Sequence, residues 1–209
     1  MYETHVPYIA SAMRQDADAF ARGVTLALLS IQQMFITVPK AMIDVEQNDT
    51  ASRFLFGSKA GAYHFLMEHK VGLHAACVAA TSPAEVIATV ATIPGIGIVK
   101  AAFVAQLMGH DVACLDTRNI QRDKRNPREY RTDGEHRKKT RAFARKIDHY
   151  VRDTGGKARE YWDTWCIDVA KTYGMTPLAV SKLHLDCVVR KTVAPIAVPF
   201  FYLSDDMPF

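Results

Sequence analysis

The chain has 209 residues, of which 49% are hydrophobic and 23% are charged. This composition excludes wholesale disorder, a collagen-like repeat and a fibrous protein. The longest nearly apolar run, residues 193–203, contains two prolines and is shorter than the ~20 residues that span a bilayer. The first ten residues lack the basic and apolar regions of a signal peptide. We therefore expect a protein that stays inside the cell and does not enter a membrane.

Positive charge is concentrated in one segment, although the net charge is only +4. Residues 118–146 contain twelve of the 26 Lys and Arg residues and four of the 22 Asp and Glu residues. Such a segment predicts a polyanionic partner. The four cysteines form no CxxC pair, which disfavours a zinc ribbon, a thioredoxin-like site or a compact iron–sulfur loop. We expect no metal and no cofactor.

Apolar residues recur at three- and four-residue spacing, which predicts an all-α protein. Ser82 and Glu85 flank Pro83 in the pattern of a capping box, which predicts a helix start there. Gly72 and Pro94 are expected to end helices. The expected helices are residues 16–33, 39–46, 58–70, 83–93, 98–109, 140–151, 157–173 and 176–189, with residues 111–115 extended and residues 194–209 forming an irregular strap.

The turn Ile93-Pro94-Gly95-Ile96-Gly97 joins two of these helices. Its glycines allow a sharp turn and bring backbone N–H groups close to an anion at a helix N terminus. A hairpin of this kind grips a nucleic-acid backbone without reading bases. A plain helix–helix turn that needs glycine is the alternative. The second helix is followed by the extended residues 111–115 and then by Asp116-Thr117-Arg118-Asn119.

The stretch IPGIGIVKAAFVAQLMGHDVACLDT, residues 93–117, resembles the signature of the helix–hairpin–helix DNA glycosylase superfamily. That superfamily includes endonuclease III, the adenine-mismatch glycosylases and the alkyladenine glycosylases. LLSIQ at residues 28–32 and GSKA at residues 57–60 match two elements upstream. The resemblance implies a two-lobed fold with a cleft, in which residues 26–122 form a helical barrel lobe and residues 1–25 with 123–209 form the other. It also implies a cytoplasmic, monomeric protein of a bacterium or phage-infected cell that binds double-stranded DNA and flips out a base.

By this resemblance Asp116 is the catalytic carboxylate, which stabilises positive charge at C1′ or activates water while an N-glycosidic bond breaks. Its alternative role is a helix N-cap, and the two roles are compatible. Val99 stands where lyase-competent members carry a Schiff-base lysine, so we expect a monofunctional glycosylase. Two alternatives stay open. One is the bacteriophage branch thought to hypermodify thymidine, in which an amine displaces pyrophosphate from an activated 5-hydroxymethyl group. The other is a non-catalytic hairpin module that only grips DNA.

Further residues are candidates for the DNA interface. Tyr161, Trp162 and Trp165 are weaker candidates for a base pocket, because helices more often pack such aromatics into the core. Gln32 and Gln33 either fill the gap left by a flipped base or form the polar end of a helix. The predicted DNA contacts are Gly95, Ile96, Gly97, Lys100, Gln32, Arg118, Arg122, Arg137, Lys138 and Lys139.

Three histidines, His64, His69 and His74, recur every five residues. On a helix this spacing scatters their side chains around the axis. A solvated or core role is therefore favoured over a metal site.

Overall fold

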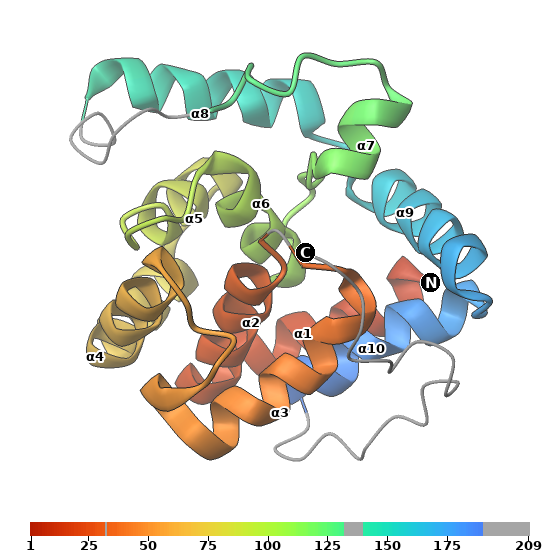
Figure 1. Ribbon diagram of the computed structural model, residues 1–209. Helices are drawn as coiled ribbons and strands as arrows, with labels where there is room; N and C mark the ends of the chain where they lie inside the picture. Colours follow the sequence, from red (N-terminus) through yellow and green to blue (C-terminus); the bar gives the residue numbers. More distant parts are fainter. Residues whose placement is uncertain (32, 132–139, 190–209) are drawn as a thin grey trace.

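The computed structural model describes residues 1–31, 33–131 and 140–189. Within these residues helices are the only regular elements, which confirms the all-α prediction, and none of them is long and apolar enough to cross a membrane. The elements (Figure 1) are α1 (Tyr2–Gln15), α2 (Ala17–Leu29), η1 (Phe35–Thr37), α3 (Val38–Asn48), η2 (Asp49–Ala51), α4 (Ser58–Ala79), α5 (Pro83–Val90), α6 (Ile98–Leu107), α7 (Thr117–Arg122), α8 (Arg141–Thr154), α9 (Ala158–Tyr173) and α10 (Pro177–Val189).

Helix α1 has no counterpart among the expected elements. Asp16 separates it from α2 by adopting an extended backbone and accepting a hydrogen bond from the Asp18 N–H at 2.9 Å. Gly23 of α2 allows the two helices to pack closely, because a Cβ there would lie 2.5 Å from Met13 Cε. The expected helix over residues 16–33 ends earlier, at Leu29.

Helix α4 corrects the prediction that Gly72 ends a helix. The helix continues through Gly72 to Ala79, and its late residue Cys77 is buried. A glycine inside a helix costs only about 1 kcal/mol relative to alanine. Packing of α4 against α2 and α5 offsets that cost.

Helices α5 and α6 pack against each other and are joined by the hairpin. The capping box of α5 is present as expected, with the Glu85 N–H donating to Ser82 Oγ and the Ser82 N–H donating to Glu85 Oε2. Helix α5 ends at Val90, before Pro94. Helix α6 is buried over nearly its whole length, and a helix that is apolar on all sides is typical of a protein interior.

The C-terminal half is attached to the rest of the molecule through the extended residues 111–115. The Ala113 N–H donates to the Thr154 carbonyl at 3.2 Å, and the Gly156 N–H donates to the Asp111 carbonyl at 3.3 Å. Helix α8 packs against α5, and α10 packs against α1 and α9 (Figure 1). The three expected helices of this half are confirmed as α8, α9 and α10.

The predicted division into lobes places its first boundary, residue 26, inside α2, and its second, residue 122, at the end of α7. Helix α2 contacts α1, α4, α6 and α10. The expected strap, residues 194–209, lies outside the described residues.

Candidate functional site

The two glycines of the hairpin between α5 and α6 have different backbone conformations. Gly95 has a φ of +79°, which favours glycine, whereas Gly97 has a φ of −93°. A Cβ on Gly97 would meet no atom within 4 Å. Gly97 is the N-cap of α6 and has no side chain that could accept a hydrogen bond from that helix start. The Gly97 end of the hairpin therefore has room for a close approach from outside.

Ile96, between the two glycines, is used by the fold. Its side chain is fully buried, and its N–H donates to the Ile93 carbonyl at 3.1 Å. Neither group is available to DNA. The geometry at Ile96 therefore does not support the predicted DNA contact. Any contact between the hairpin and DNA is left to the neighbouring residues.

Asp116 is held at both carboxylate oxygens. Its Oδ1 accepts a hydrogen bond from the Asn119 N–H at 2.9 Å, which makes Asp116 the N-cap of α7 as its alternative role requires. Its Oδ2 accepts a hydrogen bond from the Trp165 indole N–H at 2.5 Å. Two helices, α7 and α9, therefore fix the direction of one carboxylate.

Burial dominates the electrostatics of Asp116. It raises the pKa of this carboxyl above its ordinary value, against the opposing effects of the Asn119 N–H, the Lys100 ammonium, the Trp165 N–H and the Arg118 guanidinium. An aspartate with a raised pKa is a stronger base when ionised. The surroundings thus favour a carboxylate that can accept a proton.

A pocket of about 380 Å³ opens at the N terminus of α6. This volume falls in the ~300–1,000 Å³ range of small-molecule sites. Leu115, the residue directly before Asp116, lines it, and so does Lys100. Asp116 itself does not line it. The other described residues that line the pocket are Gly95, Gly97, Ile98, Val99, Ile120 and residues 125–127 and 129–131.

Lys100 connects the pocket to the end of α2. Its Nζ donates a hydrogen bond to Ser30 Oγ at 2.8 Å. Ser30 belongs to the stretch at residues 28–32 and Lys100 to the stretch at residues 93–117, so these two stretches are in contact here. Lys100 and Val99 both line the pocket.

The three aromatic candidates of α9 have different surroundings. Trp165 donates to Asp116, whereas Trp162 is buried against Phe103 and donates to Ser181 Oγ at 3.1 Å. The Tyr161 hydroxyl donates to the Asp123 carboxylate. Core packing, the favoured alternative, is confirmed for Trp162, while Trp165 is placed at the candidate site in a role that sequence reasoning did not foresee.

The two arginine candidates that the structure describes lie on α7. Arg118 Nη1 donates to Thr172 Oγ1 at 3.1 Å, which ties α7 to α9. The Arg122 guanidinium lies 4.8 Å from the centre of the Tyr161 ring, and its Nε donates to Asp123 at 3.1 Å. The remaining candidates, Gln32, Arg137, Lys138 and Lys139, lie outside the described residues.

The three histidines of α4 follow the favoured interpretation. His64 and His69 are exposed, and His69 stacks on Phe65 with ring centres 4.2 Å apart. His74 is half-buried against Phe20.

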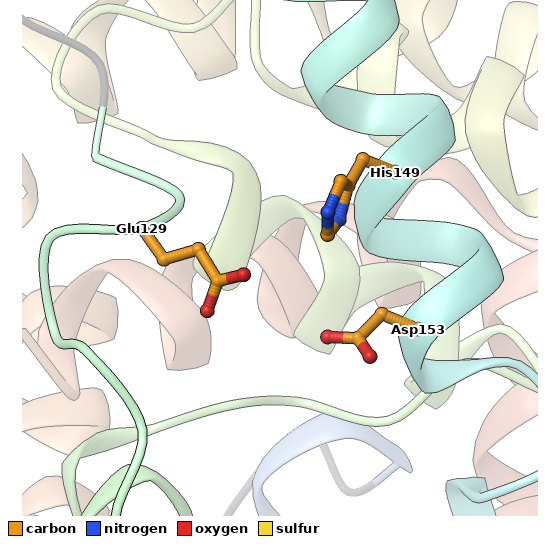
Figure 2. Close-up of side chains that lie close together, drawn as sticks. All are labelled: Glu129, His149 and Asp153. Atoms are coloured by element: carbon orange, nitrogen blue, oxygen red, sulfur yellow. The ribbon is translucent and has the colours of Figure 1, made fainter.

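Potential metal ligands come together elsewhere, and one of them, Glu129, lines the pocket. Glu129 faces His149 and Asp153, which are one turn apart on α8 (Figure 2), and their ligand atoms lie within 4.8 Å of one another. Arg125 already pairs with both carboxylates, and the Tyr130 hydroxyl donates to Asp153 at 2.6 Å. The protein thus balances this charge itself, and the cluster fastens the turn at residues 125–131 to α8.

No family model, curated protein or solved structure matches the chain. The chemistry of the site follows from its own residues. They are a half-buried carboxylate fixed at both oxygens, a lysine that acts on it electrostatically, and a pocket that opens beside a hairpin. This combination suits a reaction in which positive charge develops close to Asp116.

Proposed function

We propose that this protein is a DNA-binding enzyme that flips a base out of the duplex and hydrolyses its N-glycosidic bond without lyase activity. The observation that carries the proposal is Asp116, a half-buried carboxylate that is held by Asn119 and Trp165 and directly follows Leu115 in the wall of the pocket at the hairpin. A helix cap alone needs one carboxylate oxygen. The hydrogen bond from Trp165 to the second oxygen supports a further role.

In the proposed reaction the ionised Asp116 stabilises positive charge at C1′ and accepts a proton from water. The water oxygen forms a bond to C1′, and the bond between C1′ and the base nitrogen breaks with its electron pair leaving on the base. Val99 has no amine, and the Lys100 ammonium is bonded to Ser30 Oγ, so the proposed reaction uses no Schiff base with the sugar. The product is a free base and an intact strand with an abasic site.

The pocket supports an enzyme over a module that only grips DNA. Gripping needs the hairpin alone, whereas chemistry on a flipped base needs a space of nucleobase size. We further propose that the protein is a cytoplasmic monomer, and that a cleft between the lobes of residues 26–122 and of residues 1–25 with 123–209 receives double-stranded DNA. The basic segment at residues 118–146 supplies contacts to phosphates.

The test is product analysis on duplexes that carry a panel of modified bases, with wild type, Asp116→Asn and the exposed control Asp148→Asn. We expect a free base and strand breaks only after alkali, a loss of about 10²–10⁴-fold in turnover for Asp116→Asn, and normal turnover for Asp148→Asn. Asparagine still caps α7, so DNA binding should survive.

Other outcomes have definite meanings. A base that becomes heavier on an intact glycosidic bond would identify the hypermodification transferase instead. Full turnover in Asp116→Asn would remove this residue from catalysis. Duplex binding with no product from any modified base would leave the gripping module.

A further inference from the structure

A second, smaller pocket of about 210 Å³ lies beside the hairpin. It is formed where the end of α2, the start of α4 and the hairpin meet. Gly95 lines both this pocket and the larger one. None of the described residues that line it is acidic; they are Leu28, Ile31, Phe56, Gly57, Ser58, Lys59 and Gly95.

The start of α4 presents positive charge to this pocket. The helix has 22 residues, and its N-cap is Gly57, which offers no side chain to the first backbone N–H groups. The N terminus of a helix carries roughly half a positive charge. A Cβ on Gly57 would meet nothing within 4 Å, so an anion has room to approach.

Lys59 independently points to an anion. The residue is 4% exposed, and its Nζ is buried without a hydrogen-bond partner among the described residues. Its ammonium lies 4.7 Å from the centre of the Phe56 ring. Lysine is rarely buried unless it is paired, and a buried ammonium without a hydrogen bond is unfavourable. An anion in the pocket would relieve this cost.

The electrostatic surroundings of Lys59 also favour an anion in this pocket. Burial lowers the pKa of Lys59, and the positive charge of Lys100 lowers it further. Two ammonium groups therefore act on the same region. Lys100 has Ser30 as a partner, whereas Lys59 is left with the ring of Phe56.

We propose that the pocket at the start of α4 binds a phosphoryl group. The first-turn N–H groups of α4 other than that of Lys59, which donates to the Phe56 carbonyl, and the Ser58 hydroxyl donate to its oxygens. Lys59 changes rotamer and exchanges the Phe56 ring for a phosphoryl oxygen, which forms a charge-assisted hydrogen bond. The site is separate from Asp116 and goes beyond the proposed hydrolysis. Its phosphoryl group comes either from the DNA backbone or from free phosphate or pyrophosphate.

The experiment has two arms, both with the full chain. The first titrates inorganic phosphate and pyrophosphate by calorimetry. The second measures duplex affinity by fluorescence anisotropy over a range of salt concentrations. Lys59→Gln removes the charge and keeps most of the side chain. Lys40→Gln, on the exposed face of α3, is the matched control. Ser58→Glu is a second variant that suits a helix start and repels an anion from the pocket.

A free anion as ligand predicts phosphate or pyrophosphate binding that weakens at least about tenfold in Lys59→Gln and Ser58→Glu, and not in Lys40→Gln. A backbone phosphate predicts no such binding. It predicts instead a uniform loss of duplex affinity in the two pocket variants, with the log–log salt slope of Lys59→Gln reduced by about 0.9. Unchanged binding in both arms, or an equal loss in Lys40→Gln, would overturn the site. A chain that binds phosphate but no duplex keeps this site and contradicts the proposed function instead.

Discussion

Lys100 and Lys59 each stand in the first turn of a helix beside the same hairpin, yet their surroundings differ. Lys100 lines the larger pocket, donates to Ser30 and lies in the field of the Asp116 carboxylate. Lys59 lines the smaller pocket and has no hydrogen-bond partner among the described residues. A lysine with protein partners is fixed in place and shifts the pKa of neighbouring groups. A buried lysine without them is ready for a ligand.

Trp165→Phe should sharpen this comparison most, because Trp165 bonds to Asp116 and is not among the described residues that line the smaller pocket. The ring is kept, but the hydrogen bond to Asp116 Oδ2 is lost. That bond favours the ionised carboxylate, so its loss should raise the pKa of Asp116 further. We expect turnover to fall about 10²-fold, while phosphate binding at the smaller pocket stays unchanged. Single-turnover assays and calorimetry measure the two effects. Equal losses at both pockets would show that they are not separate sites.

Lys100→Gln should change the pH dependence of the reaction. Asp116 acts ionised, so activity is lost as pH falls through its pKa, which burial already raises. Removing the Lys100 charge takes away a stabilising partner of the carboxylate. The acid limb of kcat/KM should therefore move to higher pH, with about tenfold lower activity at its midpoint in the wild type. Lys59→Gln serves as the control, and an identical shift in that variant would contradict the distinction between the two lysines.

Lys59→Met should stabilise the protein. Methionine fills similar space and removes a buried ammonium that lacks a hydrogen bond. The expected gain is about 1–3 kcal/mol in the free energy of unfolding, measured by urea denaturation without phosphate. Lys100→Met should instead destabilise the protein, because it leaves Ser30 without its donor. A destabilised Lys59→Met would mean that the ammonium is satisfied by the Phe56 ring alone.

Substitutions at the two glycines of the hairpin should have the smallest effects on stability and DNA binding. Gly95→Ala should cost about 1 kcal/mol, because its φ is positive and alanine disfavours that backbone. Gly97→Val should fold normally, since nothing lies near its Cβ, but should weaken DNA binding equally for all sequences. Thermal unfolding and anisotropy measure these changes. Undiminished DNA affinity in folded Gly97→Val would exclude the hairpin from the interface.

Local signals were enough to predict much of the fold. Ser82 and Glu85 define a helix start because both hydrogen bonds form within four residues. The turn with Gly95 and Gly97, and the helices that follow Thr140 and Thr176, also follow from nearby residues. The continuation of α4 beyond Gly72 could not be predicted in this way, since it depends on packing against α2 and α5.

The candidate site was only partly predictable for the same reason. The position of Asp116 at a helix start can be predicted from the residues next to it. Its hydrogen bond with Trp165 joins residues that are 49 positions apart. A contact at this distance in sequence cannot be predicted from residue spacing. The environment of Lys59 likewise depends on α2 and the hairpin. The sequence shows a lysine after Gly57-Ser58, but not that its ammonium is buried.

The surroundings of Asp116 also determine when, during synthesis, the site is complete. The Leu115 N–H donates to the Tyr150 hydroxyl, which itself donates to the Ala113 carbonyl, and Trp165 lies further along the chain. A ribosome makes the hairpin well before these partners, and contacts distant in sequence form late in folding. A nascent chain that ends near residue 140 contains the whole hairpin but lacks both aromatic partners of the segment at 113–116. The hairpin is therefore made before the carboxylate can be held at both oxygens, because an incomplete chain offers it only the local N-cap bond from Asn119.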